Sequence, residues 1–361
     1  MHRPQLLGFS GAVLVILAGC APAASVDQPA VPSTSAPTPI PTATQPPAVE
    51  VLATGLSAPW SIAFLSDGTP LISERDTGEI IELGVDGSTR TVGVVDDIEP
   101  GGEAGLLGLA VDEADRLYAY STGRGQNRIQ RFRLEEGPEG LTLHEAETVI
   151  DGLPAARNHN GGRIAFGPDG MLYATVGDAG QRAEAQDLDS LAGKILRMTP
   201  DGAAPLNNPF PGSLVYSYGH RNAQGIAWAP DGTMYATEFG QDTWDELNII
   251  DPGANYGWPE VEGAGDDDRY VDPVQQWSPA EASPSGMAID EEAIYIANLR
   301  GERLRVVPLA DPADASELHV SEYGRMRDAV RAPDGRIWFL TGNTDGRGDP
   351  GPDDDLVVAI R

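Results

Sequence analysis

The stretch that decides the fold is RNHNGGRIAFGPDGMLYATVGD, residues 157–178. Its second half is a short apolar segment, the turn Pro168-Asp169-Gly170, and a second apolar segment that contains Tyr173. Proline presets φ for the first corner of such a turn, aspartate tolerates the second, and glycine accepts a positive φ. Apolar residues alternate on both sides of the turn, as is typical of half-buried strands. The stretch therefore predicts a β-hairpin.

Copies of this hairpin recur along the chain. Six copies occupy residues 63–73, 109–119, 164–174, 226–236, 287–296 and 329–339. They are separated by roughly 45–60 residues, which is the length of one four-stranded blade. A β-sandwich also contains hairpins, but it has no reason to repeat one hairpin at this spacing. We therefore predict an all-β protein, a six-bladed β-propeller of four-stranded antiparallel blades, with the first blade running from Glu50 to Val95.

Residues 1–24 have the features of a targeting segment. The apolar run 6–17 follows a short basic start and is too short to span a membrane as a mature helix. Leu-Ala-Gly-Cys at 17–20 resembles a bacterial lipobox and implies cleavage before Cys20 and lipid attachment to its sulfur. A plain secretory peptide with a chance cysteine is the alternative. We expect an exported protein that Cys20 anchors by lipid to the outer face of the cell membrane.

The composition of the remaining chain bounds its organisation. Residues 21–48 consist mostly of proline, alanine, serine and threonine, so we expect a disordered tether. Residues 49–361 are long enough for one large core in a single domain. Cys20 is the only cysteine, which excludes a disulfide and a cysteine-based metal site. The formal net charge of −31 is too acidic for a nucleic-acid-binding protein and fits a solvated acidic surface.

Short motifs carry a resemblance to a known family. They are Gly-Leu-Leu-Gly at 105–108, Asn-His at 158–159, Tyr-Gly-His-Arg-Asn at 218–222, Asp-Glu-Leu-Asn at 245–248, Asn-Tyr-Gly-Trp-Pro at 255–259 and Gly-Arg-Met-Arg-Asp at 324–328. In this order they resemble the soluble aldose sugar dehydrogenases, also called the glucose/sorbosone dehydrogenase family. The resemblance covers essentially all of 49–361. It implies a six-bladed propeller that oxidises an aldose at its anomeric carbon, with pyrroloquinoline quinone (PQQ) as cofactor and calcium bound.

The resemblance assigns His159 the role of catalytic base. A base of near-neutral pKa must take the anomeric hydroxyl proton while a hydride leaves to the quinone, and a neutral imidazole meets this requirement. The alternative is a loop histidine whose hydrogen bonds are satisfied by the backbone. Within the ordered set of motifs we favour the catalytic role.

The resemblance also implies a cofactor site. PQQ carries three carboxylates, so its site needs cations and amide donors. The residues that match this site are Glu103, His159, Arg221, Asn222, Arg300, Arg325 and Arg327. Arg325 and Arg327 lie two positions apart on an expected strand, so we expect both side chains on one face. A surface ion pair is the alternative for any one of the arginines.

Several positions depart from the family pattern. Arg300 stands where the family commonly has lysine, and Glu103 stands where it commonly has glutamine. A carboxylate at position 103 would repel an anionic cofactor unless it is protonated or paired. Phe239 replaces an expected polar residue, and Gln241 replaces the usual proline.

A calcium site is implied in the same way. Glu246 would supply its side chain and Tyr256 its main-chain oxygen, because calcium prefers oxygen ligands. The main-chain oxygens of Gly240 and Gln241 are candidates for a calcium that bridges to PQQ. A surface turn beside a buried aromatic ring is the alternative explanation of these residues.

Three functions remain open from the sequence. The first is a PQQ-dependent aldose dehydrogenase with a sugar substrate and an unidentified electron acceptor, because no Cys-x-x-Cys-His haem motif exists. The second is a calcium-dependent propeller hydrolase such as a lactonase, which needs an acidic metal cage on the channel axis. The third is a non-catalytic surface binding propeller, because one scaffold hosts many functions. The arginine set favours the first over the second.

Overall fold

The computed structural model describes residues 47–138 and 140–361. The predicted signal segment 1–24, the predicted lipidation site Cys20 and nearly all of the predicted tether 21–48 lie outside these residues. The described residues form one compact unit. Within them, no helix is long and apolar enough to cross a membrane.

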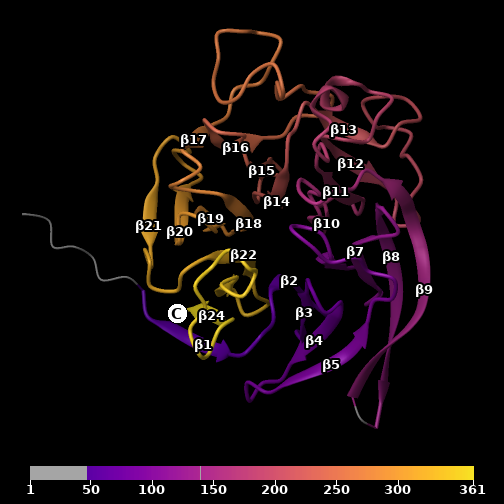
Figure 1. The fold of residues 1–361 in the computed structure, drawn as a ribbon, viewed down its shortest axis with the longest axis vertical. Helices are drawn as coiled ribbons and strands as arrows, with labels where there is room; N and C mark the ends of the chain where they lie inside the picture. Colours follow the sequence, from indigo (N-terminus) through magenta and orange to yellow (C-terminus); the bar gives the residue numbers. More distant parts are fainter. Residues whose placement is uncertain (1–46, 139) are drawn as a thin grey trace, which may run out of the picture. The chain divides into compact units, whose positions relative to one another are not determined.

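The described chain folds into six antiparallel sheets of four strands each, arranged as blades around an axis (Figure 1). This confirms the predicted six-bladed propeller. The first three consecutive blades consist of β2 (Pro59–Phe64), β3 (Pro70–Glu74), β4 (Glu79–Leu83) and β5 (Thr89–Val94), then β6 (Leu106–Val111), β7 (Leu117–Gly123), β8 (Gln126–Gly137) and β9 (Gly140–Leu153), then β10 (Ile164–Phe166), β11 (Leu172–Val176), β12 (Lys194–Met198) and β13 (Val215–Tyr218). The next two consist of β14 (Ala223–Trp228), β15 (Met234–Glu238), β16 (Asp245–Ile249) and β17 (Gln275–Trp277), then β18 (Pro284–Ile289), β19 (Ala293–Asn298), β20 (Arg303–Pro308) and β21 (Ser316–Leu318).

The last blade closes the ring with strands from both ends of the described chain. β1 (Val49–Ala53) pairs antiparallel with β24 (Val357–Ile360), which follows β22 (Met326–Arg331) and β23 (Ile337–Thr341). Our expectation that the first blade begins at Glu50 is wrong, because Glu50 pairs with Ala359 in this last blade. The sequence repeat identifies only the inner hairpin of each blade. It therefore does not show which blade β1 joins as the outer strand. β1 is the fourth, outermost strand of the last blade, and its pairing with β24 ties the two ends of the described chain together.

The repeated hairpins form the two inner strands of every blade, and adjacent blades meet through these inner strands. In the third blade the turn has the predicted geometry: the Gly170 N–H donates to the Gly167 oxygen at 2.9 Å, and Gly170 has φ +71°. Asp169 Oδ1 accepts the N–H of Met171 at 3.1 Å. The turn chemistry read from the sequence therefore sets the strand pairing.

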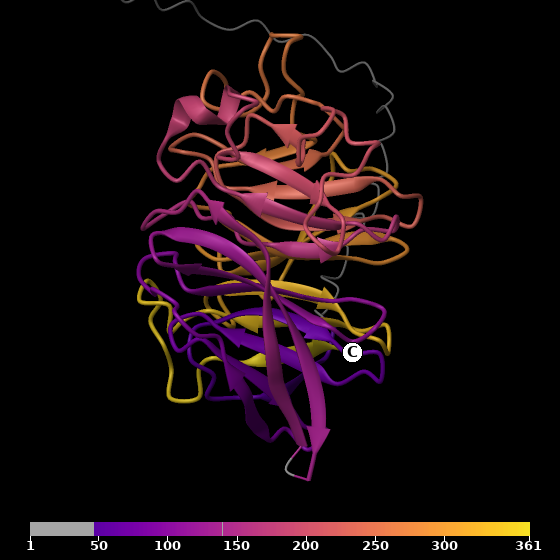
Figure 2. The same cartoon turned by 90° about the vertical axis from the view of Figure 1, so that its right-hand side faces the viewer.

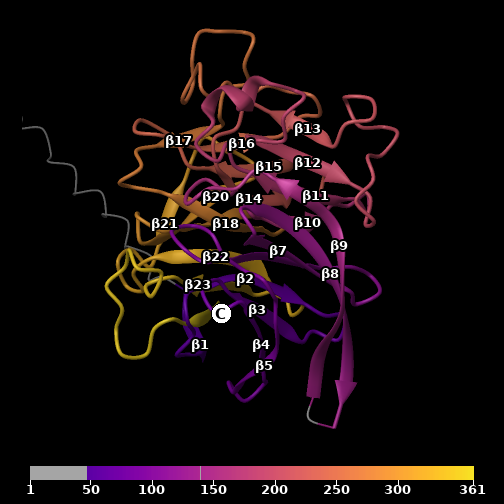
Figure 3. The ribbon, with the colours of Figure 1, turned by 45° about the vertical axis from the view of Figure 1, so that its right-hand side comes forward.

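Apolar side chains fill the spaces between blades and hold the loops in place. One cluster joins Tyr118 and Ile129 of the second blade with Leu172 and Leu196 of the third. The β8–β9 hairpin is longer than the other hairpins and extends beyond its blade (Figure 1, Figure 2 and Figure 3). The repeated turns lie at one end of the propeller, and the loops that follow every second strand lie at the other end.

Candidate functional site

Most of the predicted site residues lie in loops at the end of the propeller opposite the repeated turns. Glu103 lies in the β5–β6 loop, His159 in the β9–β10 loop, and Arg221 with Asn222 in the β13–β14 loop. Because these loops belong to different blades, their side chains can converge above the axis.

His159 is held on two sides. Its ring Nδ1 lies 2.7 Å from Asp178 Oδ1, and its main-chain N–H donates to Glu103 Oε2 at 2.8 Å. A carboxylate only accepts, so Asp178 places the ring proton on Nδ1 and leaves Nε2 as a proton acceptor. The residue has φ +60°, a conformation that is uncommon for residues other than glycine and is often found at functional sites.

Asp178 is a functional candidate that the sequence analysis did not assign. It is fully buried and also accepts hydrogen bonds from Gly180 N–H at 2.7 Å and Trp258 Nε1 at 2.9 Å. Burial alone would raise the pKa of Asp178, but these bonds and His159 bring the pKa below its ordinary value. The carboxyl therefore stays ionised and can stabilise a protonated imidazole. The sequence feature that could have identified Asp178 is the Gly-Asp pair at 177–178, which directly follows β11.

The carboxylate of Glu103 is paired with a cation. From the sequence, we expect an unpaired carboxylate at this position to repel an anionic cofactor. Its Oε2 accepts the His159 N–H and the Nδ2 of Asn222 at 3.2 Å. Its Oε1 lies 3.3 and 3.4 Å from the two Nη atoms of Arg347. Arg347 therefore offsets the negative charge that Glu103 introduces.

The guanidinium of Arg221 donates its hydrogen bonds to neutral oxygens. Its Nε and Nη2 donate to Gln241 Oε1 at 3.2 and 3.1 Å, and its Nη1 donates to the Phe239 oxygen at 3.1 Å. The guanidinium lies 5.5 Å from the ring centroid of Trp258. No carboxylate in the described part of the chain forms an ion pair with it; burial lowers its pKa, and the charges of nearby carboxylates, Asp178 first, oppose this shift. A buried cation that no carboxylate contacts directly can bind an anion.

Arg325 and Arg327 reach the same carboxylate. They lie 2.8 and 3.2 Å from Asp345 Oδ2, so the expectation that both side chains lie on one face is confirmed. Arg327 also donates to Gln224 Oε1 at 3.0 Å, and burial lowers its pKa to about 10. Two guanidinium groups share one carboxylate, so the group retains positive charge.

The structure does not join Arg300 to this network. It is exposed in the β19–β20 loop, and no hydrogen bond or ion pair among the described residues links it to the other predicted site residues. Its role in cofactor binding stays a prediction.

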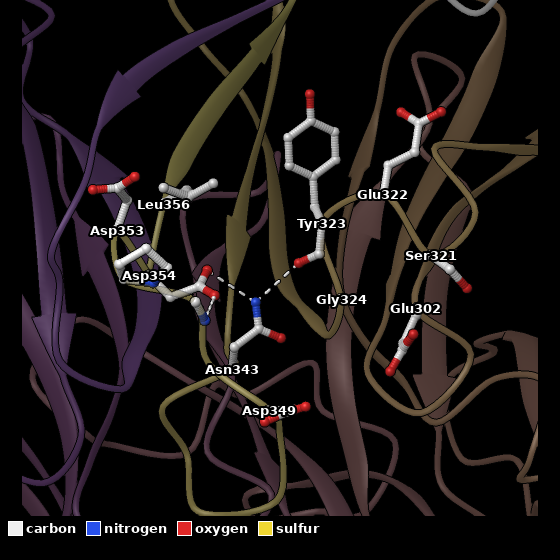
Figure 4. Close-up of a pocket in the computed structure, with 12 residues that line it drawn as sticks. Glu302, Ser321, Glu322, Tyr323, Gly324, Asn343, Asp349, Asp353, Asp354 and Leu356 are labelled. Carbon is white, nitrogen blue, oxygen red and sulfur yellow. Dashed lines mark hydrogen bonds between the residues drawn. The ribbon is translucent and has the colours of Figure 1, made fainter.

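Two pockets lie at this end of the propeller. We call the first the arginine pocket; its volume is about 500 Å³. It is lined by Arg75, Asp76, Pro100, Gly101, Gly102, Arg157, Asp345, Gly346 and Arg347. We call the second the acidic pocket; its volume is about 580 Å³, and its acidic residues are Glu302, Glu322, Asp349, Asp353 and Asp354. In it, Asn343 Nδ2 donates to the Tyr323 oxygen and to Asp354 Oδ1, each at 2.9 Å (Figure 4).

The predicted calcium residues Glu246 and Tyr256 line one small cavity together with Gly240, and its charged residues are Arg221, Glu238, Glu246 and Glu262. The cavity volume of about 10 Å³ gives room for roughly one water-sized sphere. Burial, and then the neighbouring carboxylate of Glu238, raise the pKa of Glu246. Three carboxylates and one guanidinium line the cavity, so a further cation would offset the remaining negative charge.

Hydrogen bonds shape the walls of this cavity. Glu246 accepts Asn248 Nδ2 at 2.9 Å and Gly263 N–H at 2.7 Å. Asn248 Oδ1 is buried without a hydrogen-bond partner in the part of the chain described, which leaves an oxygen unsatisfied beside Glu246. The Tyr256 ring stacks on His220 at 4.8 Å, and its hydroxyl donates to the main chain at 2.7 Å.

The loop that carries Gly240 and Gln241 is held by one carboxylate. Glu262 Oε1 accepts four consecutive main-chain N–H groups, those of residues 241–244, at 2.7–3.1 Å. Among the described residues, no group of three or more histidine, cysteine, aspartate or glutamate side chains is arranged to hold a metal ion. A calcium ion here would therefore depend on main-chain oxygens as well as Glu246.

The fold and the site define a β-propeller with a histidine–carboxylate pair at the same end as several buried arginines. The sequence matches the glucose/sorbosone dehydrogenase family over residues 56–350, and the chain belongs to this family. It is 31% identical to the aldose sugar dehydrogenase YliI of Escherichia coli strain K12 over 343 residues, 82% of this chain and 91% of that protein. The resemblance read from the ordered motifs is thereby confirmed.

Other relatives extend this comparison. The chain is 33% identical over 261 residues to the quinoprotein glucose dehydrogenase B of Acinetobacter calcoaceticus, which covers 62% of this chain and 54% of that protein. The match thus spans about half the length of that relative. The structure of the PQQ-bound aldose sugar dehydrogenase from Streptomyces coelicolor superposes with a TM-score of 0.84 at 49% identity, covering 88% of this chain and 99% of that one.

Proposed function

We propose that the protein is a PQQ-dependent aldose dehydrogenase that oxidises the anomeric carbon of a sugar to the lactone. The observation that carries this proposal is the His159–Asp178 pair at 2.7 Å, at the same end of the propeller as Arg221, Arg325 and Arg327. The PQQ-bound Streptomyces relative at 49% identity supports the choice of cofactor. The family supports a sugar as substrate.

His159 acts as the general base in this proposal. Oxidation removes a proton from the C1 hydroxyl and a hydride from C1, and His159 Nε2 accepts the proton. Asp178 keeps the hydrogen bond to Nδ1 and stabilises the imidazolium that forms, while Trp258 and Gly180 fix the carboxylate. PQQ, when bound, supplies the two-electron acceptor for the hydride.

The residues present fit an anionic quinone. Arg221 forms no ion pair among the described residues, and Arg325 and Arg327 share one carboxylate, so these guanidinium groups can bind the carboxylates of the cofactor. Asn222 supplies an amide beside them. Glu103 does not oppose binding, because Arg347 and two further donors occupy its oxygens.

We also propose a calcium ion held by the Glu246 carboxylate and the main-chain oxygen of Tyr256. The buried Glu238–Glu246 pair and the small cavity that both residues line support this site. The main-chain oxygens of Gly240 and Gln241 remain our candidates for a second calcium that would bridge to the cofactor. Their loop carries the Gln241 side chain that contacts Arg221.

The proposed enzyme is anchored outside the cell by a lipid at Cys20 and passes electrons to an acceptor that is not identified. The lipobox-like residues 17–20 support the anchor. A Cys20→Ser variant should move the protein from the membrane fraction to the soluble fraction. Retention of that variant in the membrane fraction would contradict the anchor.

The proposed function is tested by reconstitution. Purified protein given PQQ and calcium should reduce an artificial dye when an aldose is added, and it should release the corresponding lactone. Protein without PQQ is the control. Tight PQQ binding without any sugar oxidation would overturn the dehydrogenase assignment.

We favour this reading over a calcium-dependent lactonase. A lactonase would need an acidic metal cage on the channel axis. Near the axis, Asp328 is paired with Arg163 at 3.0 Å, and Arg327 lies beside them on β22. The same preparation should therefore show no calcium-dependent lactone hydrolysis.

A further inference from the structure

The arginine pocket has no role in the reaction as proposed so far. It holds three guanidinium groups, those of Arg75, Arg157 and Arg347, in a chain whose formal net charge is −31. Its walls come from the β3–β4, β5–β6, β9–β10 and β23–β24 loops. Four blades therefore contribute to a local charge that is opposite in sign to the charge of the whole molecule.

The arginines of the pocket differ in how their charge is balanced. Arg75 bonds both oxygens of Asp76, at 2.7 and 3.1 Å. Arg347 shares Glu103 with two other donors, and its side chain is 45% exposed. The Arg157 side chain is exposed and has no hydrogen bond or ion pair among the residues described. Arg157 thus brings an unmatched positive charge to the pocket.

The acids of the pocket do not cancel this charge. Asp76 is occupied by Arg75, and Asp345 Oδ2 by Arg325 and Arg327. The other oxygen of Asp345, Oδ1, accepts the main-chain N–H of Arg347 at 2.8 Å. An incoming anion would therefore meet Arg157 and the exposed part of Arg347 without displacing an existing pair.

The pocket adjoins the proposed base. His159 and Arg347 bond opposite oxygens of the same carboxylate, Glu103. The main-chain N–H of Glu103 donates to the Arg157 oxygen at 2.8 Å, and a side chain at Gly102 would collide with that oxygen. The pocket wall and the histidine loop are thus packed directly together. Arg157, which lines the pocket, lies two positions before His159 in the same β9–β10 loop.

We propose that the arginine pocket receives an oxyanion carried by the substrate at the end away from C1, so that the preferred substrates are anionic aldoses. The inference rests on the proposed function and narrows its substrate class. A guanidinium binds carboxylate and phosphate oxygens through paired hydrogen bonds, so a 6-carboxylate and a 6-phosphate are both suitable groups. A neutral hexose would gain no binding affinity from the charge of Arg157. The pocket therefore favours anionic aldoses over neutral ones.

Kinetics of the reconstituted protein test the inference. Glucose, glucuronate and glucose 6-phosphate are compared at one ionic strength, and kcat/KM should be higher for at least one of the two anions than for glucose. Arg157→Gln should lower the ratio of anion to glucose by about fivefold, as expected for a partly exposed charge pair. Arg157→Lys should keep most of the ratio. The matched control Arg133→Gln, on the exposed β8–β9 hairpin, should leave it unchanged.

Direct binding separates this inference from the proposed function. Each anion is titrated by calorimetry into wild-type protein and the Arg157→Gln variant, with and without PQQ, so the result does not depend on turnover. Weaker binding of the anion in Arg157→Gln supports the pocket even if no sugar is oxidised. Equal binding by the two proteins, or a preference for glucose over both anions, overturns the inference. A tenfold loss of PQQ affinity in Arg157→Gln would instead assign the pocket to the cofactor and also overturn it.

Discussion

The arginine pocket and the acidic pocket lie at the same end of the propeller, and the β23–β24 loop contributes to both. Residues 345–347 of this loop line the arginine pocket, and Asn343, Asp349 and residues 351–354 of the same loop line the acidic pocket. The acidic pocket is somewhat larger, yet no cation lines it. The volume of a pocket therefore does not show whether it is suited to an anion; the charged side chains that line it do. The acidic pocket has the negative charge that is expected for a surface of this strongly acidic chain when it binds no anion.

The largest expected effect is on the base. His159→Gln should lower kcat by about 10²–10⁴-fold, because that is the usual contribution of a positioned general base. PQQ binding should persist, because the arginines are unchanged. Steady-state dye reduction measures the effect, with Asp353→Asn in the acidic pocket as the matched control. Unchanged turnover in His159→Gln would remove the histidine from the mechanism and make the two pockets equivalent in chemistry.

A smaller loss is expected for the residue that orients the base. Asp178→Asn should lower kcat by about 10²-fold, since the ring then lacks its anionic partner at Nδ1. Steady-state dye reduction measures the effect, and a variant with normal kcat would show that Asp178 has only a structural role.

The next effect concerns cofactor affinity. Arg221→Gln should weaken PQQ binding by about 10–100-fold, the value of one charge-assisted hydrogen bond in a buried site. Asp353→Asn removes a negative charge from the acidic pocket and should leave the PQQ dissociation constant almost unchanged. Effects of equal size and opposite sign would mean that PQQ affinity depends only on the net charge at this end of the propeller.

The smallest effect is on stability. Chelation of calcium should lower the melting temperature of wild-type protein by a few degrees, since a ligand at about a hundred times its Kd contributes about 2.7 kcal/mol. Glu246→Gln should abolish this response and raise the stability of the calcium-free protein, because it removes a buried carboxylate beside Glu238. Differential scanning calorimetry with and without calcium measures both. A full calcium response in the variant would place the ion elsewhere.

The inner half of every blade was predictable from the sequence, and the ring closure was not. Local turn chemistry, as in Pro168-Asp169-Gly170, is written in adjacent residues and identifies the inner hairpins. The pairing of Glu50 with Ala359 joins the two ends of the chain, and the turn pattern carries no information about it. The length of the β8–β9 hairpin was unforeseen for the same reason.

The residues of the candidate site also fall into those that the sequence predicted and those that it did not. His159, Arg221 and Arg325 sit in recognisable motifs, so they were found. Two of their partners were missed because no recognised motif contains them: Asp178 lies 19 positions after His159, and Asp345 lies 20 positions after Arg325. A third contact, between Arg347 and Glu103, spans 244 positions of the sequence. That contact follows from closing the ring and not from local pattern.

The central claim is that Arg221, Arg325 and Arg327 belong to a site that binds PQQ, and an equilibrium titration of the calcium-loaded protein tests it most directly. The account predicts saturable binding of one PQQ per chain at micromolar concentration or below, with the affinity reduced in Arg221→Gln and retained in His159→Gln. Absence of binding at micromolar PQQ would contradict the account and leave a hydrolase or a non-catalytic binding propeller.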